Sequence, residues 1–448
     1  MTKKWRQRLH LEPPHGWMND PNGLCWLGGK YHVFFQYAPG GADGSGKKCW
    51  GHYESADLLK WEFVGTALLP DIPEDRDGVY SGSAIIVNDV MELFYTGNVK
   101  ESGDHDFITN GRGANVIRVS SKDGRNFSEK RVLLRNSDYP EYCSCHVRDP
   151  KVWKENGRYY MILGARTLGD EGCVLIYRSD GDLDKWQFEK KMSVPEFGYM
   201  WECPDMFEVD GHRLLSVSPQ GLPHTEAANQ NVYSSGYFRV NGDELNSFEE
   251  WDHGFDFYAP QTFSAPDGRR ILIGWMGIGD IPYTNQTVPL GWQHCLTLPR
   301  EIAVSEDGSI LQNPIHELER LRGGEFSVKD GEAFCVSLPC ELNGKPAGSF
   351  EITLDNAVSL TCDRKIFRLE FTDENIGCGR KTRNCVLKEC ADIRIIIDMS
   401  SVEIYLDGGR RVLSARFYPA GETIELQTRG ISLTGCQLNG MEVDIYDE

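Results

Sequence analysis

Three acidic residues stand at similar points along the sequence, and their chemistry suggests a role for them. Asp20 and Asp149 each directly precede a proline, and Glu202 precedes Cys203 and Pro204. Two carboxyl groups can supply the nucleophile and the proton donor that cleave a glycosidic bond, and a third can hold sugar hydroxyls and transition-state charge. A lone Asp before Pro is usually a turn residue, so this chemistry requires a fold that brings all three together.

These acids belong to a repeat that covers roughly the first 300 residues. The units start at residues 20, 82, 149, 203 and 259, and each has a short apolar strand, a turn dipeptide and a second strand rich in β-branched and aromatic residues. Such dipeptides tolerate the positive φ of tight hairpins. The five dipeptides are Gly28-Gly29, Asn88-Asp89, Asn156-Gly157, Asp210-Gly211 and Asp267-Gly268. A Trp or Phe follows later in four units, at Trp61, Phe127, Trp186 and Trp251.

A four-stranded repeat of this length is typical of a propeller blade. The sequence therefore predicts an all-β protein with a five-bladed β-propeller at residues 1–310, whose inner strands direct the three acids toward one channel. Residues 311–324 are expected to form a short helical linker, with Asn313 as N-cap, Pro314 at the first turn and glycines 323–324 at the end. Alternating strands in residues 325–448 predict a C-terminal β-sandwich.

Composition narrows the class of protein. A chain of 448 residues is too long for one compact core, and a net charge of −20 argues against nucleic-acid or anionic-membrane partners. No apolar targeting or membrane segment is visible, so we expect a cytoplasmic location with fourteen reduced cysteines. Cys143-Ser144-Cys145-His146 lacks a second ligand pair, so neither a metal nor another cofactor is expected.

Three motifs resemble the signatures of glycoside hydrolase family 32, which contains invertases, sucrose-6-phosphate hydrolases and fructanases. They are WMNDPNG at 17–23, RDP at 148–150 and WECP at 201–204. The resemblance continues in FFQY at 34–37, WGH at 50–52, YSGS at 80–83, FYAPQTF at 257–263 and GWQHCLTLPRE at 291–301. It implies the same architecture as the repeat, a five-bladed propeller followed by a β-sandwich.

The resemblance also implies roles for individual residues. Asp20 corresponds to the nucleophile, Glu202 to the acid/base, and Asp149 to the residue that binds fructose hydroxyls and stabilises the transition state. Eight further residues are implied to line the fructose pocket: Trp17, Asn19, Gln36, Trp50, Tyr80, Ser81, Arg148 and Trp292. We therefore expect a retaining hydrolase that releases β-D-fructofuranosyl residues through a covalent fructosyl-enzyme.

Several alternatives remain open at the level of sequence. Segments 198–205 and 291–301 resemble the sucrose-6-phosphate hydrolase branch, which favours sucrose or sucrose 6-phosphate as substrate, with short fructo-oligosaccharides as the alternative. A non-catalytic carbohydrate-binding propeller and an inverting, pentose-releasing propeller enzyme are the other candidates. The sequence indicates a small sugar as the binding partner and leaves the oligomeric state undetermined.

A glycine-rich loop, Gly40–Lys48, precedes Trp50 and carries two lysines. The loop fits the phosphate-loop pattern GxxxxGK, but Lys48 stands where Ser or Thr is required, and the segment WGHYES follows in place of a helix. Lys47 and Lys48 could bind a substrate phosphate at the channel mouth, or they could simply be solvated.

Overall fold

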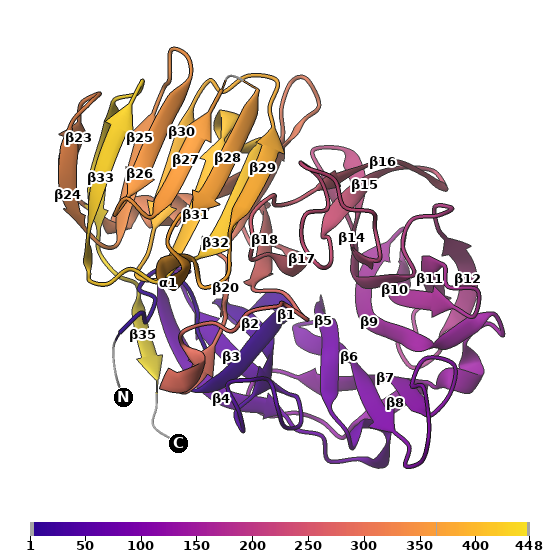
Figure 1. Cartoon of the computed structure of the whole chain (residues 1–448). Coiled ribbons are helices and arrows are strands. Elements are labelled where there is room, and N and C mark those ends of the chain that lie inside the picture. Colours follow the sequence, from indigo (N-terminus) through magenta and orange to yellow (C-terminus); the bar gives the residue numbers. More distant parts are fainter. Residues whose placement is uncertain (1–3, 364, 446–448) are drawn as a thin grey trace.

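The computed structural model describes residues 4–363 and 365–445. The chain is folded almost entirely into β-strands, and the only α-helix among the described residues is α1 (Glu374–Gly377) (Figure 1). This confirms the all-β prediction. Within the same residues, no helix has the length and apolar character needed to cross a membrane.

Five antiparallel sheets with four main strands each follow one another along the N-terminal part of the chain. Their strands are β1 (Gly16–Leu27), β2 (Lys30–Ala38), β3 (Cys49–Ser55) and β4 (Lys60–Leu68); β5 (Val79–Val87), β6 (Val90–Lys100), β7 (Arg112–Ser121) and β8 (Arg131–Leu134); β9 (Cys143–Glu155), β10 (Arg158–Thr167), β11 (Gly172–Ser179) and β12 (Gln187–Met192); β13 (Met200–Val209), β14 (His212–Gln220), β15 (Gly236–Asn241) and β16 (Glu244–Glu250); and β17 (Tyr258–Ser264), β18 (Arg270–Met276), β21 (Arg300–Val304) and β22 (Ile310–Pro314). The short strands β19 (Trp292–Gln293) and β35 (Glu442–Ile445) extend the first sheet, and β20 (Cys295–Leu296) pairs with β18.

The hairpin turns lie where the dipeptides predicted them. In four of the five turns both residues have positive φ, which suits the right-handed twist of a hairpin. In the fifth turn only Gly268 has positive φ, at 90°, and the loop between β17 and β18 is longer.

The first strand of each sheet lies next to the first strand of the following sheet, and β17 returns to β1, so the five strands form a closed order. Each of these strands has a break in its ladder near the start of its repeat unit. In the last three of them the residue before the proline has positive φ: 61° at Asp149, 47° at Cys203 and 48° at Ala259. Such β-bulges leave residues unpaired and redirect their side chains.

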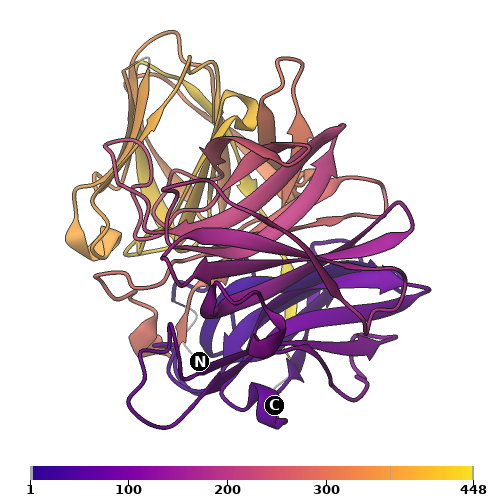
Figure 2. The same cartoon turned by 90° about the vertical axis from the view of Figure 1, so that its right-hand side faces the viewer.

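Two six-stranded sheets form the C-terminal part, which is drawn in orange and yellow in Figure 1 and lies beside the N-terminal sheets in the rotated view of Figure 2. One sheet contains β23 (Arg322–Val328), β34 (Leu433–Leu438), β25 (Cys340–Gly344), β30 (Ile393–Ile397), β31 (Ser401–Leu406) and β32 (Arg411–Arg416). The other contains β24 (Ala333–Ser337), β33 (Thr423–Arg429), β26 (Phe350–Leu354), β27 (Val358–Cys362), β28 (Ile366–Phe371) and β29 (Thr382–Val386). Buried aliphatic and aromatic side chains from both sheets share one core.

The segment between the two parts differs from its prediction. A 3₁₀ helix, His316–Leu321, lies where a helical linker was expected, but it is shorter than the predicted segment 311–324. Pro314 is the last residue of β22 and is paired with Arg300, and the amide of Asn313 donates to the carbonyl of Gly408, so Asn313 is not an N-cap. The two glycines at 323–324 continue into β23. Asn313 and Pro314 therefore pair in the ladder of the fifth sheet, although the local sequence pattern predicted that they would begin a helix.

A fully buried charged cluster joins the N-terminal segment, the fifth sheet and the C-terminal sheets. His10 contacts Asp398 (Nδ1 to Oδ2, 2.8 Å) and Glu403 (Nε2 to Oε1, 3.0 Å). The Nη2 atom of Arg300 lies 2.9 Å from Glu403 Oε2 and 3.0 Å from Asp252 Oδ2. Removing one member of such a cluster leaves an uncompensated buried charge, which typically costs about 3–5 kcal/mol.

The pKa of His10 makes this cluster sensitive to pH. Burial alone lowers the pKa, but the hydrogen bonds and charges of Asp398 and Glu403 outweigh burial and raise it from 6.5 to about 9. The protonated ring therefore stabilises the fold fully below pH 6.5, and this contribution is lost as the pH rises through 9. We expect the melting temperature to fall over this range, and a His10→Gln variant to be destabilised at pH 6 with a flatter dependence. Calorimetry on both proteins measures this, with His212→Gln at the exposed start of β14 as control. An unchanged slope in His10→Gln would contradict it.

Candidate active site

The inner strands bring the three predicted acids to one place. Asp20 comes from β1, Asp149 from β9 and Glu202 from β13, and the charge of Glu202 raises the pKa of both aspartates. The thiol of Cys203 lies between the two aspartates, 3.6 Å from Asp20 Oδ2 and 3.5 Å from Asp149 Oδ2. The backbone N–H of Cys203 also donates to Asp149 Oδ2 at 2.9 Å. One cluster therefore contains all three carboxyl groups.

The sequence had suggested that the three acids occupy equivalent repeat positions, but they do not. Asp20 and Asp149 directly precede their prolines, whereas Glu202 stands one residue earlier, before Cys203. The residues that match Glu202 in the other four sheets are Asn19, Ser81, Arg148 and Tyr258. Both positions lie at the break in the strand ladder, so the bulge supplies two kinds of functional side chain rather than one.

Asp20 is surrounded by neutral hydrogen-bond donors. The hydroxyl of Ser81 donates to Oδ2, and the amide of Asn19 donates to Oδ1 at 3.0 Å. Asn19 is itself held by the side-chain carbonyl of Gln36, which accepts from its amide, and by the indole of Trp17, which donates to Asn19 Oδ1 at 2.8 Å. Burial raises the pKa of Asp20, and the bonds from Ser81 and Asn19 oppose that rise. Neutral donors thus favour an ionised carboxylate that can attack.

Glu202 has a different set of partners. Arg148 Nη2 lies 2.6 Å from Oε1, while the hydroxyl of Tyr258 and the amide of Gln220 donate to Oε2 at 2.7 and 3.0 Å. About 17% of the Glu202 side chain is exposed, so it remains accessible to a ligand. Sequence reasoning missed Tyr258 and Gln220. The repeat could have identified Tyr258, because it precedes Ala259 as Glu202 precedes Cys203, but no motif marks Gln220.

The pKa of Asp149 is raised by its surroundings. Burial raises its pKa, the neighbouring Arg148 opposes the rise, and the charges of Glu202 and Asp20 add to it, so the pKa of Asp149 is about 7. Its backbone N–H donates to the hydroxyl of Thr96 at 2.9 Å. The structure thus holds a carboxyl group whose pKa is raised by burial and by the two acids beside it.

Two predicted pocket residues are not brought to the surface of the site. The indole of Trp50 is fully buried and donates to the carbonyl of the partly exposed Tyr80 at 3.0 Å. Trp292 is 1% exposed, lies against the guanidinium of Arg6 at 3.8 Å and donates to Glu12 at 3.2 Å. Both tryptophans therefore pack in the interior, where they hold Tyr80 and Glu12 in place.

Aromatic rings that the sequence did not single out pack around Trp17 instead. His294 lies 4.4 Å and Trp275 5.8 Å from the Trp17 ring, centroid to centroid, and Trp275 also contacts Tyr258 at 6.2 Å. These contacts fix the ring that holds Asn19, because indole and imidazole packed edge to face leave little freedom.

The two loop lysines have different environments. Lys47 is exposed. Lys48 lies over the ring of Trp17 at 4.7 Å and donates to the carbonyl of Gly44 at 3.2 Å. Burial lowers the pKa of Lys48 to about 8, and the charge of Asp20 opposes this. Lys48 therefore lies on the Asp20 side of the site.

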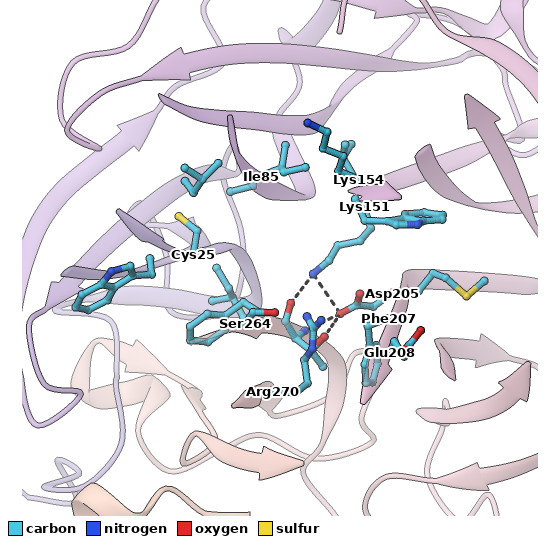
Figure 3. A pocket seen from close by; sticks show the side chains of 18 of the residues that line it. Cys25, Ile85, Lys151, Lys154, Asp205, Phe207, Glu208, Ser264 and Arg270 are labelled. Carbon is cyan, nitrogen blue, oxygen red and sulfur yellow. Dashed lines mark hydrogen bonds and ion pairs between the residues drawn. The ribbon is translucent and has the colours of Figure 1, made fainter. Parts of the chain in front are cut away.

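A separate hollow of about 540 Å³ lies further along the same inner strands (Figure 3). Lys151 points into it from β9, pairs with Asp205 at 3.2 Å and donates to the carbonyl of Thr262 at 2.6 Å and to the side chain of Gln261 at 3.1 Å. This pair lines the hollow between the inner strands, beyond the acids. The two ends of the inner strands thus carry different groups.

Two clusters among the described residues have the atom types of a metal site, but neither includes the three acids. The buried cluster of His32, His52 and Glu54 is already neutralised, because Glu54 pairs with Lys30 and Arg125. In the exposed cluster of Glu301, His316 and Glu317, Arg269 pairs with both carboxylates.

Comparisons with known proteins agree along most of the chain. Residues 10–314 match the family model described as "Glycosyl hydrolases family 32 N-terminal domain", and residues 347–442 match "Glycosyl hydrolases family 32 C terminal". Sucrose-6-phosphate hydrolase of Bacillus subtilis is 38% identical over 92% of this chain and 89% of its own length. Raffinose invertase of Escherichia coli is 35% identical, with 94% and 91% covered.

Solved structures show the same similarity. Sucrose-6-phosphate hydrolase from Lactobacillus gasseri superposes with a TM-score of 0.89 and 28% identity, covering 98% of this chain and 94% of that one. A mutant of a Bombyx mori GH32 beta-fructofuranosidase in complex with sucrose gives a TM-score of 0.86 and 29% identity, covering 99% and 96%.

The raised pKa of Asp149 predicts a cost to stability at high pH. The folded chain holds this proton more tightly than the unfolded chain, so the contribution is complete below pH 3.8 and is lost as the pH rises through 7. Asp149→Asn removes that loss, and we expect the variant to gain at least about 1 kcal/mol over the wild type between pH 5 and pH 8. Thermal unfolding at both pH values tests this, with Asp89→Asn in an exposed turn as control. A stability difference that does not change with pH would refute it.

Proposed function

The chain belongs to glycoside hydrolase family 32, and we propose that it hydrolyses sucrose or sucrose 6-phosphate, releasing the β-D-fructofuranosyl unit with retention of configuration. The observation that carries this proposal is the contrast between two carboxyl groups in one cluster. Asp20 accepts from neutral donors, while Glu202 accepts from Arg148, Tyr258 and Gln220. Carboxyl groups with different environments can take the two roles that glycosidic cleavage needs.

In the proposed reaction Asp20 attacks C2 of the fructosyl unit while protonated Glu202 gives its proton to the glycosidic oxygen, so that the glucosyl unit leaves as an alcohol. The bond between C2 and the glycosidic oxygen breaks as the bond between C2 and Asp20 forms. Glu202 then takes a proton from water, which attacks C2 and releases fructose. Asp149 accepts from fructose hydroxyls, and its negative charge stabilises the oxocarbenium-like transition state.

We also propose that the five four-stranded sheets are five blades of a β-propeller, since their first strands contact one another in a closed order. The blades would comprise β1 to β22, residues 16–314, with β35 added to the first blade, and β23 to β34, residues 322–438, would form the sandwich. These bounds replace the predicted ones, residues 1–310 and 325–448, because β22 and β23 extend into the expected linker. We also propose a cytoplasmic location, where a reducing environment would keep the fourteen cysteines as thiols. Comparing kcat/KM on sucrose, sucrose 6-phosphate, 1-kestose and inulin would separate these substrates from short fructo-oligosaccharides.

The two catalytic roles lead to a direct prediction. Asp20→Asn and Glu202→Gln should each lower kcat by at least about a thousandfold, because each removes a group that the chemistry requires, while circular dichroism stays unchanged. Azide should partly restore turnover in Glu202→Ala, since a small anion can replace the base-activated water. Steady-state rates and the anomer of the first product, read by NMR, measure the outcome. Near-normal kcat in Glu202→Gln would exclude Glu202 as the acid/base.

Tyr258 provides a second prediction. Its hydroxyl holds Glu202 Oε2, so Tyr258→Phe should lower kcat by about 10- to 100-fold, with a smaller change in KM. Tyr233→Phe is a matched control, because the Tyr233 ring packs against Tyr258 but its hydroxyl donates to Asp280. Equal losses in the two variants would show that packing, not the bond to Glu202, explains the effect.

A further inference from the structure

Arg112, the first residue of β7, is a cation with unused hydrogen-bond donors beside the acid/base. Its Nη1 atom donates to the side-chain carbonyl of Asn98 at 3.2 Å, and its Nε atom is buried without a partner. Within residues 4–363 and 365–445, no carboxylate forms an ion pair with it. Burial lowers its pKa, the charge of Arg148 lowers it further, and the charge of Glu202 raises it, so Arg112 lies within the field of both.

The two other arginines in this region are already paired. Arg148 pairs with Glu202 at 2.6 Å, and Arg166 pairs with Asp170 at 2.7 Å. His146 lies among the three arginines, and burial together with their charges lowers its pKa to about 3, so the imidazole is neutral. The third arginine of the group is thus the one whose charge has no carboxylate partner in the described chain.

The position of Arg112 is built into the surrounding loop. The side-chain amide of Asn136 donates to the carbonyl of Arg112 at 3.0 Å, and its side-chain carbonyl accepts from the N–H of Ala114 at 2.7 Å. The loop that precedes Arg112 is bound to β9, because the N–H of Cys145 donates to the carbonyl of Ile108 at 2.7 Å. Cys145 stands three residues before Arg148 on that strand. Side-chain bonds from Asn136 and the backbone bond at Ile108 therefore hold Arg112 next to the strand that carries Arg148.

The chemistry of the two carboxyl groups decides which part of the substrate meets this arginine. The nucleophile faces the fructosyl carbon, and the acid/base faces the leaving group, so the glucosyl unit lies on the Glu202 side. In sucrose 6-phosphate the glucosyl unit carries the phosphate. Lys48 lies near Asp20, on the fructosyl side, and Lys47 is exposed, so neither loop lysine is the better candidate.

We propose that Arg112 binds the phosphate of the leaving glucose 6-phosphate unit and sets a preference for phosphorylated sucrose. The inference rests on the proposed function, since it assumes that Glu202 protonates the leaving group. A guanidinium offers planar paired donors that match phosphate oxygens, and the partly buried position of Arg112 reduces competition from water. A neutral substrate would leave these donors to water, so the preference arises from one charged contact.

The test measures kcat/KM for sucrose 6-phosphate and for sucrose in the wild type, Arg112→Gln and Arg112→Lys. We expect the ratio of the two values to fall by about tenfold or more in Arg112→Gln, mainly through KM for the phosphorylated sugar, and to recover in part in Arg112→Lys. The wild-type ratio should also fall at high salt. Inorganic phosphate should inhibit sucrose cleavage more weakly in Arg112→Gln. Arg131→Gln is the control, because Arg131 is an exposed arginine of the same sheet that pairs with Asp184.

The outcomes separate this inference from the proposed function. If the wild type cleaves neither sugar, the proposed function itself is wrong. If it cleaves both and the ratio is the same in Arg112→Gln and Arg112→Lys as in the wild type, the phosphate is bound elsewhere. A fall in the ratio in Lys47→Ala/Lys48→Ala but not in Arg112→Gln would overturn the inference and place the phosphate on the Asp20 side. Melting temperatures of all variants show whether each is folded, and Arg112→Lys keeps the comparison decisive if Arg112→Gln is not.

Discussion

Three carboxyl groups share one poorly hydrated site with a single ion-paired arginine, and most features of the site follow from that constraint. Burial raises the pKa values of both Asp20 and Asp149, and the negative charge of Glu202 adds to both rises. Arg148, the cation that forms an ion pair with one of these acids, is used by Glu202. Asp20 must therefore be stabilised by neutral donors, and its partners are a hydroxyl and an amide rather than a base.

The β-bulges of the inner strands are the backbone solution to this constraint. A regular strand would direct alternate residues away from the site, whereas the break in each ladder directs consecutive residues toward it. Asn19 and Asp20 act as such a pair, as do Arg148 and Asp149, and Glu202 and Cys203. Positive φ at Asp149 and Cys203 is part of this geometry and is disfavoured for residues with side chains, so the surrounding sheets must hold it in place.

Charged groups buried away from the site differ from the acids in how they are paired. The cluster of His10, Arg300 and Glu403 joins three parts of the chain in the dry interior, and the pair of Lys151 and Asp205 lines the hollow beyond the acids. In both places positive and negative charges are paired and hydrogen-bonded, which is what burial requires. At the active site three carboxyl groups share one ion-paired arginine, so the site has an excess of negative charge. This excess can stabilise a positively charged transition state.

The sequence by itself determined the features that depend on local chemistry. Turn dipeptides such as Asn156-Gly157 and the prolines after Asp20 and Asp149 act through their own backbone angles, so the repeat, the all-β class and the candidate acids were readable in advance. The tertiary structure alone decided the one-residue offset of Glu202, the partnership of Gln220 with it, the burial of Trp50 and Trp292, and the placement of Lys48 and Arg112 on different sides. These depend on contacts between residues far apart in the chain, where strand register and competition for space, rather than local preference, set the outcome.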